Sequence, residues 1–271
     1  MSYLLFHFVF ILPVIFAVTL LRREAKKPDI KGAVSGTVVL AAIAFTYTTP
    51  WDNYLVASGV WYYGSDRVIE SAILGYVPVE EYLFFILQPI LTAGFLLWYL
   101  AKSPQITTRL KDKLERRKPA YLGCALFLGL TAIAAGMLLS GNQQLRYLAL
   151  ILVWACPVLA FQWAYGGGTL YRLRRVALPA ILAPTAYLCV VDMIALKLGI
   201  WVINPATSTG IHLYLLPLEE GLFFLLTNLL VVQGLLLYYQ FMTVRAAQKA
   251  PAVVRRPSEE LALASRNREE A

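Results

Sequence analysis

Long apolar runs alternate with short polar segments along most of this chain. Seven of these runs are roughly 20 residues long, the length at which a helix crosses the hydrocarbon core of a bilayer. They cover residues 3–21, 32–49, 79–100, 120–140, 147–165, 176–195 and 217–241. Each should be an α-helix, because backbone groups in lipid must hydrogen-bond within their own segment. The pattern predicts an all-α integral membrane protein with seven transmembrane helices.

The composition and the placement of charge support a multi-pass membrane protein. Of 271 residues 59% are hydrophobic, with 6 Trp, 16 Tyr and 13 Phe, which is more apolar than an ordinary soluble domain. The net charge of +8 does not indicate nucleic-acid binding, because 21 of the 24 lysines and arginines fall in polar segments on one side of the predicted membrane. By the positive-inside rule, the N-terminus lies outside the cell membrane and the C-terminus lies in the cytoplasm. A basic rim against anionic lipid accounts for the charge.

Metal and cofactor signatures are missing from the sequence. The three cysteines lie singly inside apolar runs, and the two histidines, His7 and His212, lie far apart. Neither arrangement has the ligand spacing of a metal site. The glycine cluster at 166–168 lacks the spacing of a dinucleotide fingerprint and is expected in a loop between spans. We therefore expect no metal and no cofactor.

Two pairs of segments repeat along the chain. DNYLVASGVW (52–61) and DMIALKLGIW (192–201) share Asp, Gly and Trp at the same spacing, and PVEEYLFFIL (78–87) and PLEEGLFFLL (217–226) share Pro, both Glu, Leu and both Phe. Three spans per unit would invert the second copy, but an intervening fourth helix restores its orientation. The predicted arrangement is two parallel three-helix repeats, at 1–100 and 147–242. A basic cytoplasmic loop and linking helix occupy 101–146, and a disordered cytoplasmic tail occupies 243–271.

The paired glutamates of the two repeats are the leading candidates for chemistry. Glu80, Glu81, Glu219 and Glu220 fall on the same, non-cytoplasmic side and are expected to meet at the interface between the units. Acids in a first helical turn are also ordinary helix starts. Their occurrence as a pair in both units, followed by Phe-Phe, favours a shared site. A carboxyl group withdrawn from water favours its protonated form and can act as a general acid. Aromatic faces beside it stabilise a cation, so the pattern is typical of carbocation chemistry.

A second group of polar residues accompanies the glutamates. Asp52 and Asp192 follow the second and sixth spans, each with a tryptophan nine residues further on. The tryptophans also fit an interfacial aromatic belt. Asp192 lies in a run apolar enough to be within the membrane, which favours a cavity or a partner for it. Thr227 and Asn228 are placed to hydrogen-bond such carboxylates, or else to join helices.

The segments FTYTTPWDNYLVASGVWYY (45–63), GYVPVEEYLFF (75–85) and PLEEGLFFLLTN (217–228) resemble the membrane-integral lycopene cyclases. That family occurs as two three-span subunits in some actinobacteria and as a fused chain in archaea, some other bacteria and fungi. The resemblance covers residues 1 to 241. It implies closure of the ψ ends of lycopene to β-rings, through γ-carotene to β-carotene, with no net redox change. Fungal members continue into a phytoene synthase, whereas this chain ends about 30 residues after its last span, so we expect a monofunctional enzyme.

The resemblance also implies roles for the candidate residues. Glu80 and Glu219 are the leading acid/base candidates, followed by Glu81 and Glu220, and the sequence does not decide which gives the proton and which accepts it. Asp52 orients them or relays protons. The residues expected to bind substrate and stabilise the cation are Phe84, Phe85, Phe223, Phe224, Trp61, Trp201, Asp192, Thr227 and Asn228. Expected partners are lycopene, the monocyclic intermediate, membrane lipid and other enzymes of the carotenoid pathway. The second unit lacks the Thr-Pro-Trp-Asp-Asn surround of Asp52, so the halves should contribute unequally to one composite site.

Several alternatives remain at this stage. A carotenoid hydratase would quench a similar cation with water, and a related cyclase would take another acyclic carotenoid. A retinal photoreceptor needs a lysine within a span, usually the last, and residues 217–241 contain none. A proton-coupled transporter needs a polar path to the cytoplasm, for which the lower halves of the third and seventh spans offer only Thr92 and Gln233.

Overall fold

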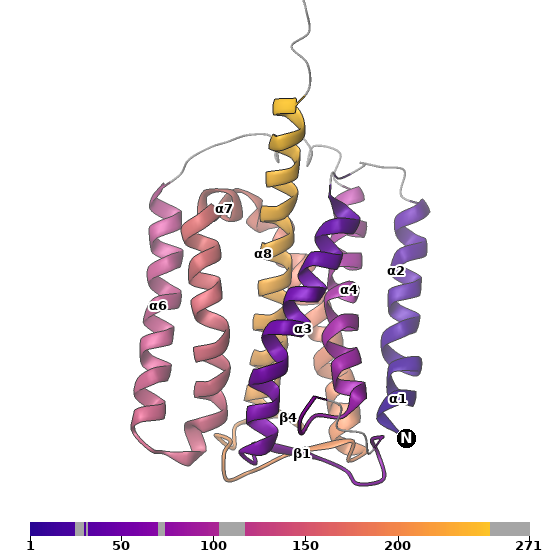
Figure 1. Ribbon diagram of the computed structural model, residues 1–271, viewed down its shortest axis with the longest axis vertical. Helices are drawn as coiled ribbons and strands as arrows, with labels where there is room; N and C mark the ends of the chain where they lie inside the picture. Colours follow the sequence, from indigo (N-terminus) through magenta and orange to yellow (C-terminus); the bar gives the residue numbers. More distant parts are fainter. Residues whose placement is uncertain (25–29, 31, 70–73, 103–116, 250–271) are drawn as a thin grey trace, which may run out of the picture.

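The computed structural model describes residues 1–24, 30, 32–69, 74–102 and 117–249 (Figure 1). The elements in chain order are α1 (Tyr3–Phe6), the π-helix η1 (His7–Ile11), α2 (Leu12–Glu24), α3 (Ala33–Ala57), β1 (Trp61–Tyr63), α4 (Val79–Ala101), α6 (Arg117–Leu139), the 3-10 helix η2 (Gln143–Leu145), α7 (Arg146–Lys197), β2 (Trp201–Ile203), β3 (His212–Leu213), β4 (Leu216–Pro217) and α8 (Leu218–Lys249). The predicted tail from residue 250 and most of the predicted basic loop, residues 103–116, lie outside the described residues. Residues 243–249 continue α8.

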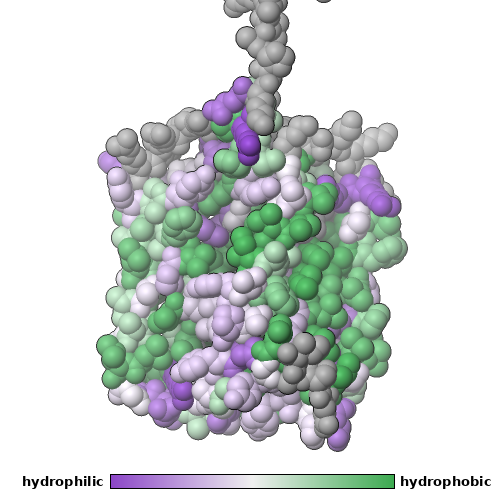
Figure 2. Space-filling model, viewed as in Figure 1, coloured by the Kyte–Doolittle hydropathy of each residue, from purple (hydrophilic) through white to green (hydrophobic). Residues whose placement is uncertain are grey.

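Long apolar helices dominate the described part of the chain, and six of them there are long enough to cross a membrane. They run side by side, with the N-terminus and the short strands at one end and the last turns of α8 at the other (Figure 1). On the face shown in Figure 2, hydrophobic side chains cover much of both flanks, weakly hydrophilic ones run along the centre, and most of the strongly hydrophilic ones lie near the two ends. The prediction of an all-α membrane protein is confirmed.

The helices divide into an outer and an inner set. In the outer spans, Tyr3–Arg23, Ala33–Ala57 and Lys118–Leu139, only 17% to 22% of the apolar window is buried. In α4, α7 and α8 the share is 50% to 61%. Apolar side chains of these three inner helices form one core, including Leu96, Ala180 and Leu235. The two helices that begin with the glutamate pairs, α4 and α8, are therefore both inner helices.

The predicted spans 147–165 and 176–195 form one helix, α7, which bends at Gly166. Gly166 has non-helical backbone angles (φ −144°, ψ 27°), so α7 has a first arm before it and a second arm after it. A Cβ atom at Gly166 would overlap the side chain of Leu237, and one at Gly167 would overlap the backbone of Ala120. The predicted loop at 166–168 is shortened to a break at Gly166 that separates the two predicted spans, and glycine allows close helix packing there.

The second helix is longer than the predicted span at 32–49. α3 continues through Pro50 to Ala57, so Asp52 lies inside the helix and does not follow it. Asp192 likewise lies inside the second arm of α7. The predicted end of this span at residue 49 was too early, because Pro50 removes one backbone donor but tertiary packing still stabilises the turns after it.

α3 and α7 end in the same way and direct the chain into two paired strands. Gly59 (φ 72°) and Gly199 (φ 62°) follow the two helices in the left-handed conformation, which glycine adopts without a steric cost at a helix C-terminus. β1 and β2 then pair antiparallel, with Trp61 opposite Ile203, Tyr62 opposite Val202, and Tyr63 opposite Trp201. The strand pair thus joins two segments about 140 positions apart in the sequence, at one end of the inner helices.

Candidate active site

Glu81 and Glu220 lie in the first turns of α4 and α8, and tyrosine hydroxyls bind both carboxyl groups. Tyr3 and Tyr63 donate hydrogen bonds to Oε2 of Glu81 at 2.9 and 3.1 Å. Tyr147 donates to Oε1 of Glu220 at 2.6 Å. Both glutamates line one pocket, which we name the carboxylate pocket. The start of the chain, β1 and the first arm of α7 thus each contribute a donor to this pair.

Glu80 and Glu219 have a different environment from their neighbours. Oε1 of Glu80 accepts a hydrogen bond from the backbone N–H of Ile69 at 2.9 Å, and Oε1 of Glu219 accepts one from that of Thr209 at 2.7 Å. Both side chains are buried, with 1% and 0% exposure, and neither lines the carboxylate pocket. Consecutive helical residues point about 100° apart. In each glutamate pair, therefore, the first member is hydrogen-bonded to a loop and the second lines the pocket.

The two aspartates also differ. Both interact electrostatically with Glu81 and Glu220, but only Asp52 lines the carboxylate pocket. Asp192 accepts a hydrogen bond from Nε1 of Trp201 at 3.1 Å and is absent from the pocket lining. Oδ2 of each aspartate is buried without a hydrogen-bond partner among the described residues. Of the two aspartates, only Asp52 lines the same pocket as Glu81 and Glu220.

Tyr63 is a titratable group of this site that lies outside the spanning helices, in β1. Burial, and then the nearby carboxyl groups of Glu81 and Asp52, raise the pKa of the Tyr63 phenol well above its ordinary value. A neutral phenol is favoured where water is excluded and negative charge is near. The Tyr63 hydroxyl therefore keeps its proton and serves as a hydrogen-bond donor.

Aromatic rings complete the wall of the carboxylate pocket. Trp61 packs against Tyr147 with ring centroids 5.4 Å apart, and Phe84 meets Phe224 edge to face at 6.4 Å. The full lining is Asp52, Trp61, Tyr63, Glu81, Phe84, Tyr147, Trp201, Ile203, Glu220, Phe223 and Phe224. Acidic groups and π-faces thus surround the same space, the combination that protonates an alkene and stabilises the resulting cation.

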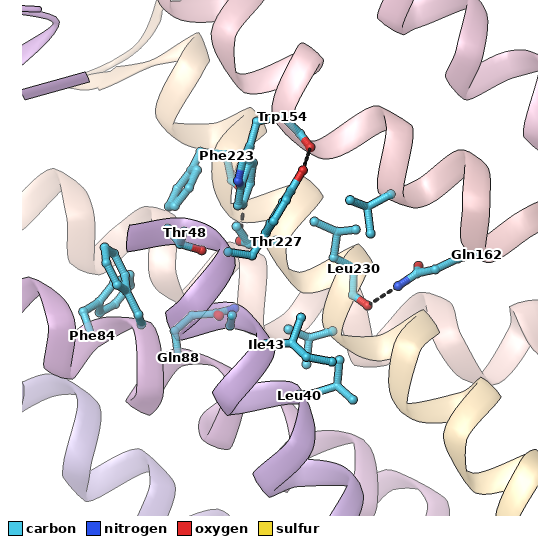
Figure 3. A pocket seen from close by; sticks show the side chains of 15 residues that line it. Leu40, Ile43, Thr48, Phe84, Gln88, Trp154, Gln162, Phe223, Thr227 and Leu230 are labelled. Carbon is cyan, nitrogen blue, oxygen red and sulfur yellow. Dashed lines mark hydrogen bonds between the residues drawn. The ribbon is translucent and has the colours of Figure 1, made fainter. Parts of the chain in front are cut away.

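A second cavity, which we name the apolar groove, adjoins the carboxylate pocket and shares Phe84 and Phe223 with it. Figure 3 shows these two rings on one side of the groove and Leu40, Leu230 and Gln162 on the other. The groove is lined by Leu40, Ile43, Ala44, Tyr47, Thr48, Phe84, Phe85, Gln88, Trp154, Val158, Gln162, Phe223, Thr227, Leu230 and Val231. Its residues come from α3, α4, the first arm of α7 and α8.

The apolar groove opens toward the lipid-facing surface between α3 and α7. Ile43 and Tyr47, in the middle of α3, are 53% and 40% exposed. Tyr47 reaches across to α7, where its hydroxyl donates to the carbonyl of Trp154 at 2.9 Å and its ring stacks on the indole. An apolar molecule dissolved in the bilayer would meet this opening at mid-membrane depth.

Thr227 and Asn228 do not hydrogen-bond the carboxyl groups. The Thr227 hydroxyl donates to the carbonyls of Phe223 and Phe224 in its own helix, and its side chain lines the apolar groove. Asn228 instead joins three helices: its Oδ1 accepts from Gln88 and Thr92, and its Nδ2 donates to Thr185. Of the two interpretations considered for Asn228, the geometry favours interhelical packing.

Sequence reasoning missed the tyrosines that bind the central glutamates. Tyr3 and Tyr147 each lie near the start of the first span of a predicted repeat, 144 positions apart, but candidate residues were taken only from the repeated aspartate and glutamate segments. Tyr63 lies inside the segment compared with the family, yet only its neighbour Trp61 was singled out. Tyr63 is 18 positions from Glu81, but Tyr3 and Tyr147 are 78 and 73 positions from the glutamates that they bind, so a local search would not have found those two.

His7 is a further buried polar group beside the site. Its Nε2 lies 2.9 Å from the carbonyl oxygen of Glu80, and its ring packs 4.6 Å from that of Tyr3. It begins the π-helical segment η1, a local distortion that is frequent near functional sites. No group of three His, Cys, Asp or Glu side chains suited to a metal ion occurs among the described residues.

These features define a polytopic helical membrane protein with carboxyl and aromatic groups enclosed beside a groove open to lipid. The chain belongs to the lycopene cyclase family, whose model matches residues 1–99 and 144–238. It is 40% identical over 237 residues to a protein of Halobacterium salinarum named lycopene beta-cyclase, covering 88% of this chain and 95% of that one.

Fungal relatives extend beyond the matched region. The chain is 38% identical over 248 residues to the bifunctional lycopene cyclase/phytoene synthase of Leptosphaeria maculans, covering 88% of this chain and 41% of that protein. The protein of the same name from Aspergillus niger is 38% identical over 199 residues, with coverages of 73% and 34%. No solved structure matches this chain.

Proposed function

We propose that this protein is a lycopene β-cyclase that converts the ψ ends of lycopene into β-rings by acid–base catalysis through a carbocation. The observation that supports it most is the convergence of Glu81, Glu220 and Asp52 in an aromatic pocket that adjoins an apolar groove. Acyclic carotenoids are apolar polyenes, so they reach the enzyme from the bilayer. A ψ end that enters between α3 and α7 passes Phe84 and Phe223 to reach the carboxyl groups.

The reaction needs an acid, a base and protection of a cation. A carboxyl group protonates the terminal double bond, which leaves a tertiary cation. A neighbouring double bond attacks the cation and closes a six-membered ring. A carboxylate then removes a ring proton, so the product is an isomer of the substrate. The surrounding rings stabilise the cation, because their π-faces are negative, and they exclude water that would quench it.

We assign the acid and the base to Glu81 and Glu220. Both line the carboxylate pocket and are accessible to a substrate there, whereas Glu80 and Glu219 accept hydrogen bonds from loop amides. Asp52 lines the same pocket and interacts electrostatically with both glutamates, so we assign to it the return of the proton from base to acid after each turnover. The proposal reverses the order of importance within each glutamate pair that the sequence favoured.

The proposed enzyme has seven membrane crossings in two parallel repeats, with the two arms of α7 crossing separately. Related contacts recur in both halves. The backbone N–H of Ile69 donates to Glu80, and that of Thr209 donates to Glu219. In each half the donor lies in the segment that joins β1 or β2 to the inner helix carrying the glutamate. The N-terminus is outside the cell membrane and the C-terminus is cytoplasmic. Lycopene comes from preceding enzymes of carotenoid synthesis, and γ-carotene returns through the lipid to present its second end.

Expression in a lycopene-accumulating bacterial host, followed by pigment analysis, tests this function. The wild-type chain should give γ-carotene and β-carotene, and the matched control with both Glu81→Gln and Glu220→Gln should leave lycopene unchanged at equal protein level. Unchanged lycopene with well-expressed, folded wild-type protein would contradict the proposal. Hydroxylated acyclic products would instead show a hydratase, and activity only on another acyclic carotenoid would show a cyclase of different specificity.

A further inference from the structure

The two halves of the carboxylate pocket differ at one pair of corresponding positions. Trp61 and Trp201 begin β1 and β2, so Tyr63 and Ile203 both occupy the third position of their strands. In the antiparallel pair each stands opposite the other strand's tryptophan, and both line the carboxylate pocket. The first half therefore offers a phenol where the second half offers an aliphatic side chain.

This difference changes the hydrogen bonding of the central glutamates. Glu81 accepts two phenolic hydrogen bonds, from Tyr3 and Tyr63. Glu220 accepts one, from Tyr147, and Ile203 has no hydroxyl to add a second. Donors to a carboxyl group favour its ionised form. Glu220 is also the more buried of the two, at 6% exposure, whereas Glu81 is partly exposed, and burial disfavours the ionised form. Glu81 is therefore the better carboxylate and Glu220 the better carboxylic acid.

The contact geometry of Glu220 also suits an acid. Tyr147 donates to Oε1, which leaves Oε2 available to carry the acidic proton. Both phenols that contact Glu81 converge on Oε2, which leaves its Oε1 free to accept a proton from substrate. Each group thus keeps one oxygen for chemistry.

We propose that Glu220 delivers the proton that starts ring closure, that Glu81 removes the ring proton that ends it, and that Tyr63 is a positioning residue that keeps Glu81 ionised. This assignment rests on the proposed function and deepens it. The O–H bond of Glu220 breaks as a C–H bond forms at the terminal double bond. The ring C–C bond then forms, and a ring C–H bond breaks as its proton passes to Glu81. Transfer of that proton to Glu220, through Asp52, restores the starting state.

The first test compares the single variants Glu220→Gln and Glu81→Gln in the lycopene-accumulating host. Without the acid, lycopene consumption should fall by about 10²- to 10⁴-fold, the usual contribution of a general acid. Without the base, the cation still forms, so lycopene should still be consumed more slowly, giving rings with a displaced double bond or hydroxylated ends. The reverse pattern, or equal and complete loss of lycopene consumption in both variants, would overturn the assignment. The proposed function would still stand if the wild-type protein were active.

The second test uses Tyr63. In membranes containing the full chain, Tyr63→Phe should lower kcat by about 10-fold with KM unchanged, because it removes one hydrogen bond to a charged group. The effect should vanish when Glu81→Gln is already present. Tyr62→Phe, on the neighbouring and 54% exposed residue, is the control and should match wild type. A rise in KM alone, or an unchanged effect in the Glu81→Gln background, would contradict the positioning role.

The reciprocal substitution, at Ile203, tests the role of Glu220 as the acid. Ile203→Tyr adds a hydroxyl on the side of Glu220 and should slow the initial protonation, whereas Ile203→Phe supplies the same ring without the hydroxyl. We expect the tyrosine variant to be slower than the phenylalanine variant by about 10-fold. Equal rates for the two would show that the hydroxyl has no influence on Glu220, against the proposed asymmetry.

Discussion

The carboxylate of Glu80 accepts a 2.9 Å hydrogen bond from the backbone N–H of Ile69, so this glutamate holds the loop that precedes its own helix. Glu80→Ala should therefore lower stability by about 1–3 kcal/mol, since it leaves a partly buried amide without its partner. Glu80→Gln should cost less, because its amide oxygen still accepts the bond. Thermal unfolding of detergent-solubilised protein measures both.

The same two variants separate a loop role from a catalytic one. Folded Glu80→Gln protein should keep most of its cyclisation per molecule, while Glu81→Gln, one residue on, should lose its normal product. If Glu80→Gln were fully folded and inactive, Glu80 would belong to the chemistry after all. The matched pair Glu219→Gln and Glu220→Gln should repeat the contrast in α8.

Asn228 joins α4, α8 and the second arm of α7 through hydrogen bonds to Gln88, Thr92 and Thr185. Replacing it by leucine leaves buried polar groups without partners, and we expect a loss of about 1–2 kcal/mol. Thr227→Val is the control, because the Thr227 hydroxyl bonds only to carbonyls of its own helix. Equal unfolding temperatures for the two variants would show that the network adds little.

The sequence was sufficient to predict the membrane class, most of the spans and the two glutamate pairs, because these depend on local hydrophobicity and on repeated motifs. It did not predict the role of each glutamate within a pair. Glu80 and Glu81 are adjacent and chemically identical, and only the position of Ile69 relative to Tyr3 and Tyr63 distinguishes them. Those contacts link residues up to 78 positions apart, so no local pattern encodes them.

The interruption in α7 was predicted, but the close packing around it was not. Three consecutive glycines indicate a break between two spans when the chain is considered alone, and Gly166 does have non-helical backbone angles. In the folded protein, Gly166 and Gly167 lie against Leu237 and Ala120, which leaves no room for a Cβ atom. These neighbours are distant in sequence, so no local pattern encodes the close packing.

The apolar groove predicts where a bulky side chain will block the substrate. Ala44 lines the groove on α3, so Ala44→Trp should fill space needed by the polyene and raise KM by about 10-fold or more, with little change in stability. Val39→Trp is the control, since Val39 is on the same helix, exposed and absent from the groove lining. Initial rates of lycopene conversion in membranes at several substrate loads measure the difference. Equal KM values for the two variants would place the entry route elsewhere.

The linking helix α6 packs against the first arm of α7 through Gly123, where a Cβ atom would overlap the ring of Trp163. Gly123→Ala should therefore force α6 away from α7 and lower stability by about 1–3 kcal/mol. Gly129 lies on the same helix, and a Cβ atom there would meet no other described residue within 4 Å. Gly129→Ala should therefore be neutral or stabilising by up to about 1 kcal/mol.

No residue of α6 lines the carboxylate pocket or the apolar groove, so α6 should affect folding and not chemistry. Gly123→Ala protein that remains folded at low temperature should cyclise lycopene at the wild-type rate per molecule, although its yield and unfolding temperature fall. Loss of turnover in the folded fraction would mean that α6 shapes the site through Trp163 and the first arm of α7, whose Tyr147 binds Glu220. The ratio of activity to folded protein, measured for both glycine variants, therefore decides whether the linking helix acts only as a structural connection between the two halves.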